Sequence, residues 1–173
     1  MYDEHFSMLM RGQFRQLLAL EGTREERFAD GTRLTAEGEP CDRLYFVIAG
    51  ECKLYLSGAF AKTLDEGSFV NDVAFQRGAA DAGAYGTVVT SGDDVRAIGW
   101  DIQRLRDHLE GRPEMDRNMR YCLTTHLVKG LLQQRKAAHH TIGRWSKDRL
   151  EDGSDDGANG GLDGSQDRAV LAT

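Results

Sequence analysis

The stretch DGTRLTAEGEPCDRLYFVIAGECKLY, from Asp30 to Tyr55, carries the strongest structural signal in this chain. It holds two runs rich in β-branched and aromatic residues, 44–48 and 53–56, separated by a break at Gly50. Such runs, bounded by turn residues, predict strands. Glycine at a strand corner supplies the positive φ or bulged geometry that a sharply folded sheet needs. The stretch therefore predicts a mainly β fold with tightly bent strands.

The spacing of the glycines in this stretch points to a particular kind of β fold. Gly31-x6-Gly38-x11-Gly50, with Leu44-Tyr45-Phe46 before the third glycine, resembles the opening of the cyclic nucleotide-binding β-roll. This resemblance implies a double-stranded β-helix, or jelly roll, with flanking N- and C-terminal helices. In that family the roll forms a ligand pocket, and the helices act as flap and lid. Some other small β-barrel or jelly roll is the alternative.

The pattern outside this stretch predicts further strands and an N-terminal helix. Residues 5–20 are expected to form an amphipathic helix, with an apolar face made of Phe6, Leu9, Met10, Phe14, Leu17 and Leu18. Turns are expected at 65–68 and 91–94, where Asp, Glu, Gly and Ser cluster. The predicted strands are 32–35, 43–49, 51–57, 60–64, 86–91 and 95–100.

Helical periodicity returns after Trp100. Asp101 is the expected N-cap of a helix that runs to about Glu110, and Pro113 suits the first turn of the helix that follows. This second helix, predicted at 114–134, carries one apolar stripe made of Met115, Met119, Cys122, Leu123, Leu127 and Leu131. The stripe fits either a lid that seals the roll or a homodimer contact.

Length and composition limit the classes open to this chain. At 173 residues it fits one domain with appendages. It has no apolar run of about 18 residues that could span a bilayer, and its N-terminus lacks the pattern of a secretory signal. Cys41, Cys52 and Cys122 have no metal-site spacing, so buried free thiols in a reducing cytosol are expected. We therefore expect a cytoplasmic protein.

Charge divides the chain into two parts. The formal net charge is −6, but Glu151 to Thr173 contains six acidic residues and one Arg, which leaves −1 for residues 1–150. The Gly/Asp/Ser-rich end cannot bury enough apolar surface to become ordered. We predict a domain at 1–136 and a basic, then acidic, disordered tail at 137–173. A near-neutral body is not typical of nucleic-acid binding. A solvated helix face is the expected role of the basic residues in 129–149, and contact with a membrane surface or a nucleic acid is the alternative.

The resemblance also implies where a ligand would bind. In the family, one short helix between two strands holds the cyclic phosphate, with the pattern Phe-x-Gly-Glu-x-Ala followed by Arg-x-Ala-Thr. Backbone N–H groups and the Arg bind the phosphate, and the acid accepts a hydrogen bond from the ribose 2′-OH. Here Asp72 falls at the acidic position, Asn71 replaces the glycine, Thr87 is kept and Ala84 stands in place of the Arg. The predicted ligand-binding residues are Phe69, Val70, Asn71, Asp72, Val73, Arg77, Ala84 and Thr87.

A more specific resemblance is to the Popeye domain. Residues 69–75 are similar in length and ends to its Phe-Ile-Asp-Ser-Pro-Glu-Phe motif, and 85–88 to its Gln-Val-Thr-Ile. Residues 96–105 look like its Arg-Tyr-Leu-Cys-Trp-x-Arg-x-x-Leu stretch, and the similarity runs from about Gly12 to Leu132. It implies cyclic AMP (cAMP) binding without the usual Arg. Popeye domains normally follow three membrane spans, which this sequence lacks, so the chain is either a soluble relative or a fragment of a membrane protein.

Three of the candidate ligand-binding residues also have a purely structural explanation. Asp72 suits the first turn of any helix, Thr87 an ordinary strand position and Arg77 an exposed loop. His126 and the pair His139-His140 have no carboxylate or Cys at ligand spacing, so no metal site is predicted. No catalytic triad, Cys-His pair or phosphate-binding loop is visible, so an enzyme is not expected.

These patterns favour a non-enzymatic, Popeye-like cAMP sensor. Its lid helix would close over the roll and report ligand occupancy to a protein partner. One alternative is a degenerate β-roll that no longer binds nucleotides and serves as a dimerisation or scaffolding domain, which Ala84 favours. The other is a cyclic-nucleotide-regulated fragment of a channel or kinase. Membrane contact would need a missing N-terminal region or a membrane partner.

Overall fold

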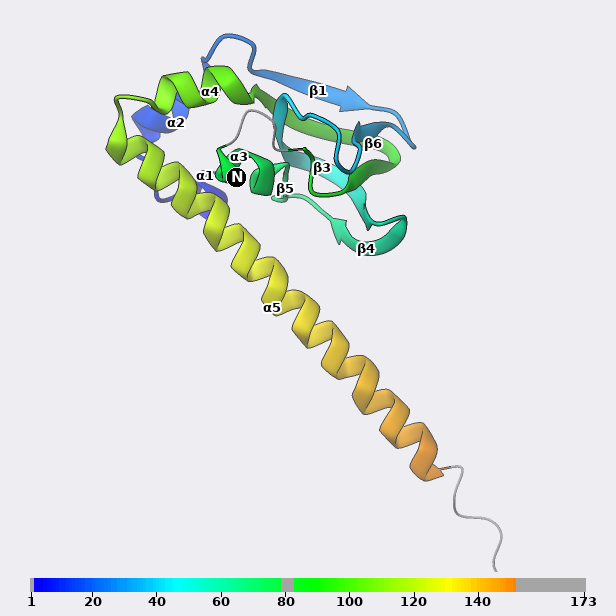
Figure 1. Cartoon of the computed structure of the whole chain (residues 1–173). Coiled ribbons are helices and arrows are strands. Elements are labelled where there is room, and N and C mark those ends of the chain that lie inside the picture. The colour runs from blue at the N-terminus through cyan, green and yellow to red at the C-terminus, as the bar shows by residue number, and fades with distance from the viewer. Residues whose placement is uncertain (1, 79–82, 152–173) are drawn as a thin grey trace, which may run out of the picture. The chain divides into compact units, whose positions relative to one another are not determined.

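The computed structural model describes residues 2–78 and 83–151, with side chains described as far as Leu132. The chain divides into two units, Met1–Leu131 and Leu132–Thr173. The elements in chain order are α1 (Tyr2–His5), α2 (Arg11–Leu18), β1 (Arg24–Phe28), β2 (Arg33–Thr35), β3 (Arg43–Leu56), β4 (Ala59–Leu64), β5 (Phe69–Val70), α3 (Asp72–Arg77), β6 (Thr87–Asp101), α4 (Ile102–Leu109) and α5 (Pro113–Glu151) (Figure 1).

The strands of the first unit form an antiparallel sheet in the order β1-β6-β3-β4, with β2 added to β6 and β5 added to β3. The two long central strands, β3 and β6, pair from Arg43 opposite Asp101 to Tyr55 opposite Thr87. Helices flank the sheet at both ends of the chain's first unit (Figure 1). The predicted fold, a β-roll with N- and C-terminal helices, is confirmed.

The two long strands are bent rather than broken, which corrects the prediction of strands ending at a turn in 91–94. Along β3 the pairing partner jumps from Arg96, opposite Ala49, to Ser91, opposite Glu51. The intervening residues of β6 form a bulge within one strand, because extra residues can bend a strand without ending it. Gly50 makes this possible: its φ is +78°, and a Cβ there would lie 3.0 Å from the Asp94 carbonyl oxygen.

The N-terminal helix is also corrected, because the predicted helix at 5–20 is two short helices, α1 and α2, with a turn between them. The turn lets Phe6 and Leu9 both enter the core, where they are completely or almost completely buried. The Gln13 side chain accepts a hydrogen bond from the Met10 backbone N–H at 3.0 Å and so starts α2. Met10 and Leu18, predicted on the buried face, are exposed.

Strand β1 was not predicted, because its sequence REERF shows no apolar alternation. It is held by pairing with β6, from Arg24 opposite Gly99 to Phe28 opposite Val95. The Glu25 carboxylate also pairs with the Arg96 guanidinium at 3.2 Å. Tertiary pairing therefore overrides a weak local pattern here.

The predicted C-terminal helix starts are confirmed. The Asp101 carboxylate caps α4 by accepting from the Arg104 backbone N–H at 2.9 Å, and Pro113 begins α5. The predicted end of the second helix at 134 is wrong, because α5 continues to Glu151. Residues 137–151, predicted as part of the tail, thus have a helical backbone. Gln, Lys, Arg and Ala are common there and favour helix, and Gly130 alone does not end it. The rest of the predicted tail lies outside the described residues.

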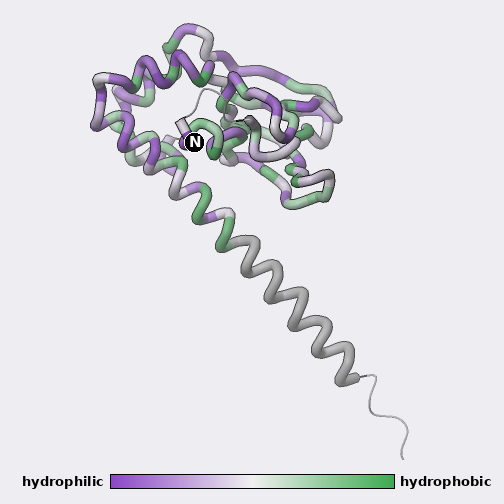
Figure 2. Tube along the Cα trace, in the orientation of Figure 1, coloured by the Kyte–Doolittle hydropathy of each residue, from purple (hydrophilic) through white to green (hydrophobic). Residues whose placement is uncertain are grey.

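The first unit has two hydrophobic clusters. The larger packs α1, α2, α4 and the start of α5 against β3 and β6 around Trp100, whose indole N–H donates to the Leu17 carbonyl at 2.9 Å. The smaller lies inside the roll and contains Val47, Cys52, Leu64, Val70, Val88 and Val95. The apolar stripe of α5 is buried from Met115 to Leu123, but further along Val128, Leu131 and Leu132 are exposed. Figure 2 shows that hydrophobic residues continue along α5 up to the part drawn in grey.

Candidate functional site

The site predicted from the sequence is built on β5 and α3. Phe69 and Val70 are buried and pair with β3, Phe69 opposite Phe46 and Val70 opposite Tyr45. The chain then turns at Asn71, whose φ of 70° is left-handed, and enters α3 at Asp72. Asn is among the few residues with a Cβ that tolerate this conformation. Asn71 therefore holds a left-handed turn of the kind that glycine adopts readily, and its side-chain amide donates to the Arg43 carbonyl at 2.8 Å.

Asp72 is the most unusual group of the site. It is the first residue of α3, with a relative exposure of 8%. Its carboxylate accepts a hydrogen bond from the Val73 backbone N–H at 3.0 Å and makes no ion pair with any described residue. Burial raises the pKa of Asp72 from its ordinary value of 3.8 to about 6, against the opposing effect of the Val73 N–H and the Lys62 charge. The site thus holds a buried carboxylate with unused acceptor capacity.

Ala84 and Thr87 belong to a second segment that closes on the loop after β2. Ala84 is buried, its N–H donates to the Glu39 carbonyl at 2.8 Å, and its carbonyl accepts from the Gly38 N–H at 2.9 Å. The Thr87 hydroxyl oxygen accepts from the Glu37 backbone N–H at 3.1 Å. The Thr87 hydroxyl is therefore engaged in holding this loop, and Ala84 offers no charge to a ligand.

Arg77 is not brought to the start of α3. It occupies the last turn of this helix and is exposed, roughly 8 Å along the helix axis from Asp72. Val73 follows Asp72 and is half-buried. The predicted residues from Phe69 to Val73 thus form one continuous segment, whereas Arg77 lies at the other end of the helix.

A lysine that sequence reasoning did not single out lies near this segment. Lys62 is half-buried on β4, and its charge lowers the pKa of both Asp72 and His126. His126 stacks edge-on against Phe69, with ring centroids 5.5 Å apart, and burial lowers its pKa to about 4. A single lysine in a short strand gives no sequence signal. Only the pairing register of β4 with β3 shows on which face of the sheet the Lys62 side chain lies.

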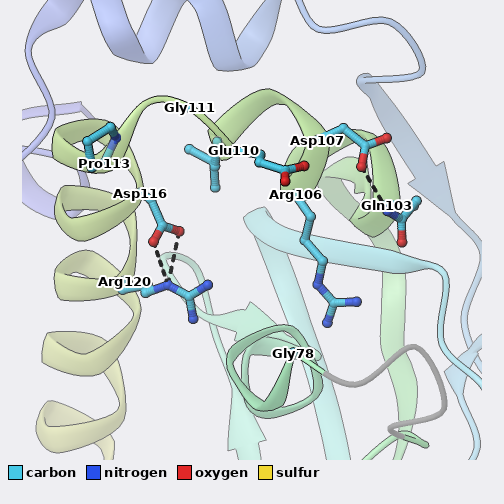
Figure 3. A pocket seen from close by; sticks show the side chains of 10 residues that line it. Gly78, Gln103, Arg106, Asp107, Glu110, Gly111, Pro113, Asp116 and Arg120 are labelled. Atoms are coloured by element: carbon cyan, nitrogen blue, oxygen red, sulfur yellow. Dashed lines mark hydrogen bonds and ion pairs between the residues drawn. The ribbon is translucent and has the colours of Figure 1, made fainter.

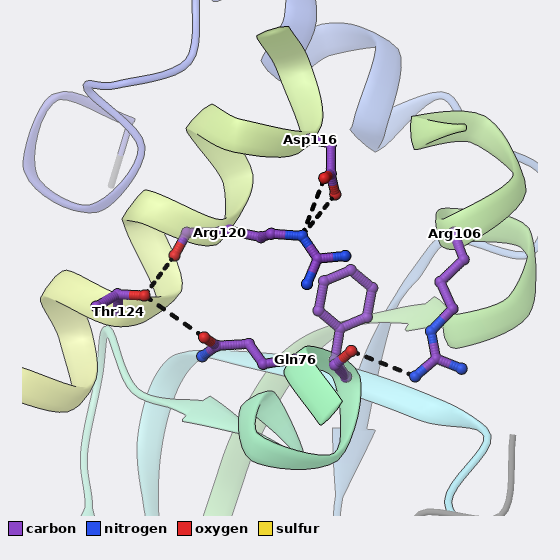
Figure 4. A network of polar contacts seen from close by, with 6 residues as sticks. Gln76, Arg106, Asp116, Arg120 and Thr124 are labelled. Atoms are coloured by element: carbon purple, nitrogen blue, oxygen red, sulfur yellow. Dashed lines mark hydrogen bonds and ion pairs between the residues drawn. The ribbon is translucent and has the colours of Figure 1, made fainter. Parts of the chain in front are cut away.

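Side chains from α4 and α5 connect α3 to the C-terminal helices. The Arg106 guanidinium donates to the carbonyl oxygens of Ala74 and Phe75, each at 3.2 Å, and Figure 4 draws one of these two bonds. The Phe75 ring, completely buried, has Arg106 of α4 at 5.7 Å and Arg120 of α5 at 5.8 Å from its centroid. The Arg120 Nε donates to both Asp116 carboxylate oxygens at 2.9 Å. Phe75 is therefore held by cations from two different helices.

A cavity of about 450 Å³ opens beside this connection (Figure 3). Its walls include Arg106, Asp107 and Glu110 of α4, Asp116 and Arg120 of α5, and Gly78 after α3. Residues 69–73 do not line it. Acidic side chains outnumber the two arginines on these walls, so this cavity does not offer a site for a phosphate.

No cluster of three or more metal-ligating residues occurs among the residues that the structure describes. The side chains of His139 and His140 lie outside them. Cys52 and Cys122 are buried thiols, as predicted, Cys41 is half-buried, and none of the three forms a disulfide. Burial raises the pKa of the Cys52 thiol to about 11, which makes it a poor nucleophile. In the described part of the chain, no helix has the length and hydrophobicity of a membrane span.

Comparison with known proteins agrees with this geometry. Residues 25–110 match the family model of the cyclic nucleotide-binding domain, so this segment of the chain carries that domain. No curated protein matches the sequence. The chain is similar in structure to a protein from Geobacter metallireducens described as a candidate cyclic nucleotide-binding protein, with 16% identity and a TM-score of 0.65. The match covers 74% of this chain and 92% of that one.

Two further solved structures show the regulatory settings in which this fold occurs. The N-terminal domain of a transcriptional regulator from Streptomyces coelicolor is 23% identical with a TM-score of 0.55, over 77% of this chain and 89% of that domain. A regulatory subunit of a cAMP-independent protein kinase A from Trypanosoma cruzi, bound to guanosine, is 19% identical with a TM-score of 0.52. That match covers 58% of this chain and about a third, 34%, of the subunit. At these identities the likeness establishes the fold.

Proposed function

We propose that this chain is a non-enzymatic cyclic-nucleotide sensor of the Popeye type, with cAMP as the first ligand to test. The observation that carries the proposal is the buried carboxylate of Asp72 at the start of α3. A carboxylate there can accept the ribose 2′-OH, and it has acceptor capacity that no described protein group uses. The family match over residues 25–110 supports a cyclic nucleotide as the ligand class.

The phosphate would be held without an arginine, as the Popeye resemblance implies. Backbone N–H groups of residues 70–73 are the donors that would face it, helped by the helix dipole, and the Val73 N–H would exchange its present acceptor, the Asp72 carboxylate, for the phosphate. The left-handed turn at Asn71 supports this role, because it lets the chain enter the helix as a glycine would. Because Ala84 carries no positive charge, we expect the nucleotide to bind more weakly than it would with an arginine at this position.

The link between α3 and the C-terminal helices would transmit occupancy. A ligand that shifts α3 must also shift the Ala74 and Phe75 carbonyls, which Arg106 holds, and the Phe75 ring, which Arg120 covers. Because these contacts come from α4 and α5, ligand binding would change the packing of α5 on the roll. The readout would then be a partner that recognises α5.

A degenerate β-roll that serves as a dimerisation or scaffolding domain is the second candidate. Two observations favour it: Ala84 lacks the charge for a phosphate, and Val128, Leu131 and Leu132 expose apolar surface on α5. A homodimer through α5 would cover these residues. Sedimentation of the parent chain and of Leu131→Glu tests this, since a dimer should dissociate in the variant, whereas a parent that is monomeric at all concentrations excludes the contact.

Titration calorimetry of the full chain with cAMP and cyclic GMP (cGMP) tests the sensor proposal. Asp72→Ala should weaken binding by about 1.5–3 kcal/mol, roughly 10- to 150-fold, the range for a hydrogen bond to a charged group. Glu66→Gln is the matched control, because this exposed acid lies in the preceding turn. Ala84→Arg should tighten binding if that position faces the phosphate. No binding by the parent at millimolar nucleotide, with no gain from Ala84→Arg, would favour the scaffold.

A further inference from the structure

Strand register places Lys62 on the inner face of the roll. Lys62 of β4 lies opposite Leu54 of β3, which in turn lies opposite Val88 of β6. Directly opposed residues in an antiparallel sheet share one face. Val88 is buried and Leu54 packs with it in the cluster inside the roll, and Leu64, two residues beyond Lys62, is buried there too. The Lys62 stem therefore leaves β4 on the ligand side of the sheet.

The ammonium group of Lys62 ends against α5. Its Nζ lies 3.4 Å from the position that a Cβ would take at Gly130, so the absence of a side chain on α5 leaves room for the charge. His126 lies one turn earlier on the same helix, and its neutral ring stacks on Phe69 of the predicted site. Lys62 makes no ion pair or hydrogen bond with the residues that the structure describes. Its three donors are thus available.

The arginines near α3 are either engaged by other groups or lie at the far end of this helix. The Arg43 guanidinium donates to the Gly22 carbonyl at 3.0 Å and lies 3.6 Å from the Glu26 carboxylate. Arg106 holds the opposite end of α3 through Phe75, and Arg77 is exposed there. The electrostatic effect of Lys62 reaches Asp72, so its charge is felt at the start of the helix.

We propose that Lys62 supplies the positive charge for the cyclic phosphate that Ala84 cannot supply. This inference rests on the proposed nucleotide site and names the cation that completes it. An anion placed beside the buried Asp72 carboxylate would be repelled and poorly solvated without a compensating charge. Lysine suits this role because its flexible side chain can move the ammonium from α5 toward the ligand. Neutralising the phosphate charge does not require the rigid, planar guanidinium of an arginine.

The chemistry predicts a selective effect of this lysine. Because Lys62 would contact the phosphate, it should matter for cAMP and cGMP equally and not for adenosine, which has no phosphate. A lysine that instead read the base would favour guanine, which presents the acceptors O6 and N7, over adenine, which presents a donor at N6. The two roles are therefore separable by the choice of ligand.

The test compares Lys62→Met with the parent chain, by calorimetry with cAMP, cGMP and adenosine. Lys53→Met is the matched control, because Lys53 neighbours Leu54 on β3 and so faces the other side of the sheet. We expect Lys62→Met to lose at least about tenfold in affinity for both cyclic nucleotides and less than about threefold for adenosine, with Lys53→Met unchanged. Lys62→Arg should retain binding, and Ala84→Arg added to Lys62→Met should recover most of the loss. Thermal melting verifies that each variant is folded.

Four results would overturn the inference. An equal loss for adenosine would show that Lys62 supports the fold of the site, and a loss confined to cGMP would show that it reads the base. Unchanged cAMP affinity in Lys62→Met would remove the lysine from the site while leaving the sensor proposal intact. If the parent binds none of the cyclic nucleotides at millimolar concentration, even with Ala84→Arg, the proposed function itself fails and the role of Lys62 falls with it.

Discussion

Replacing Asp72 by asparagine should make the protein more stable at neutral pH. The amide oxygen of the introduced side chain would still accept the Val73 N–H, which is the hydrogen bond that the Asp72 carboxylate makes now. The substitution removes a negative charge that is almost hidden from solvent, since Asp72 is only 8% exposed. Because no described residue forms an ion pair with this carboxylate, the charge costs free energy in the folded state.

The size of the cost follows from the pKa of Asp72, which is about 6 in the folded protein and 3.8 ordinarily. At about 1.36 kcal/mol per tenfold change in proton affinity, this difference corresponds to about 3 kcal/mol as an upper value. The raised pKa means that the folded state holds the proton more tightly than the unfolded state. The cost is therefore fully present above a pH of about 6 and is relieved as pH falls from about 6 toward 3.8.

Urea denaturation of the parent and of Asp72→Asn at pH 7.5 and pH 4 measures this effect. We expect the variant to gain about 1–3 kcal/mol at pH 7.5 and less than about 1 kcal/mol at pH 4. Glu66→Gln, an exposed neighbour, should stay within about 0.5 kcal/mol at both pH values. A variant that is less stable than the parent at pH 7.5 would refute the reasoning, because it would mean that the carboxylate is satisfied in the folded state. Stability gained together with cAMP affinity lost would identify Asp72 as a residue kept for binding.

Three further measurements bear on the same arrangement. Burial lowers the pKa of His126 to about 4, so folding stability should fall as pH drops from 6.5 toward 4. In urea denaturation, His126→Gln should reduce that fall, and an unchanged dependence of stability on acid pH in the variant would contradict this prediction. Arg106→Gln removes the hydrogen bonds to the Ala74 and Phe75 carbonyls and should cost about 1–3 kcal/mol, whereas Arg104→Gln, whose pair with Glu21 is exposed, should cost much less. Truncation after Leu150 should leave the melting temperature nearly unchanged, and a fall of many degrees would show that the acidic end supports the fold.

The sequence predicted those parts of the structure that depend on local patterns. Glycine spacing and alternating apolar residues indicated the roll, and Asp101 and Pro113 marked helix starts through their capping chemistry. The sequence predicts a break in the strand at Gly50, whereas β3 bends there and continues to pair with β6 on both sides. A bulge and a turn use the same residue types and differ only in whether the pairing with the neighbouring strand continues. Strand β1 could not be predicted, because its mostly polar sequence has no strand pattern and pairing with β6 holds it in place.

The candidate site was predictable only where it is contiguous. Residues 69–73 lie together because they follow one another, and the left-handed turn at Asn71 could be anticipated from the glycine it replaces. Lys62 could not be found, because its direction depends on a register with β3 that no local pattern specifies. The sequence alone leaves Arg77 either in the last turn of α3 or in the loop that follows, because helix ends are poorly specified by local pattern.

The pairing of β3 with β6 also determines the order in which this chain can fold. The first unit closes through contacts between distant segments, such as the Trp100 indole and the Leu17 carbonyl, which are 83 positions apart. Folds dominated by such non-local pairing form in about milliseconds to seconds, because loop entropy is lost before the contacts form. During synthesis, β1, β2 and β3 would leave the ribosome before β6, the strand with which each of them pairs. The local pairing of β3 with β4 can form earlier, but the sheet cannot close until β6 is available, so one edge of the apolar strand β3 stays unpaired until then.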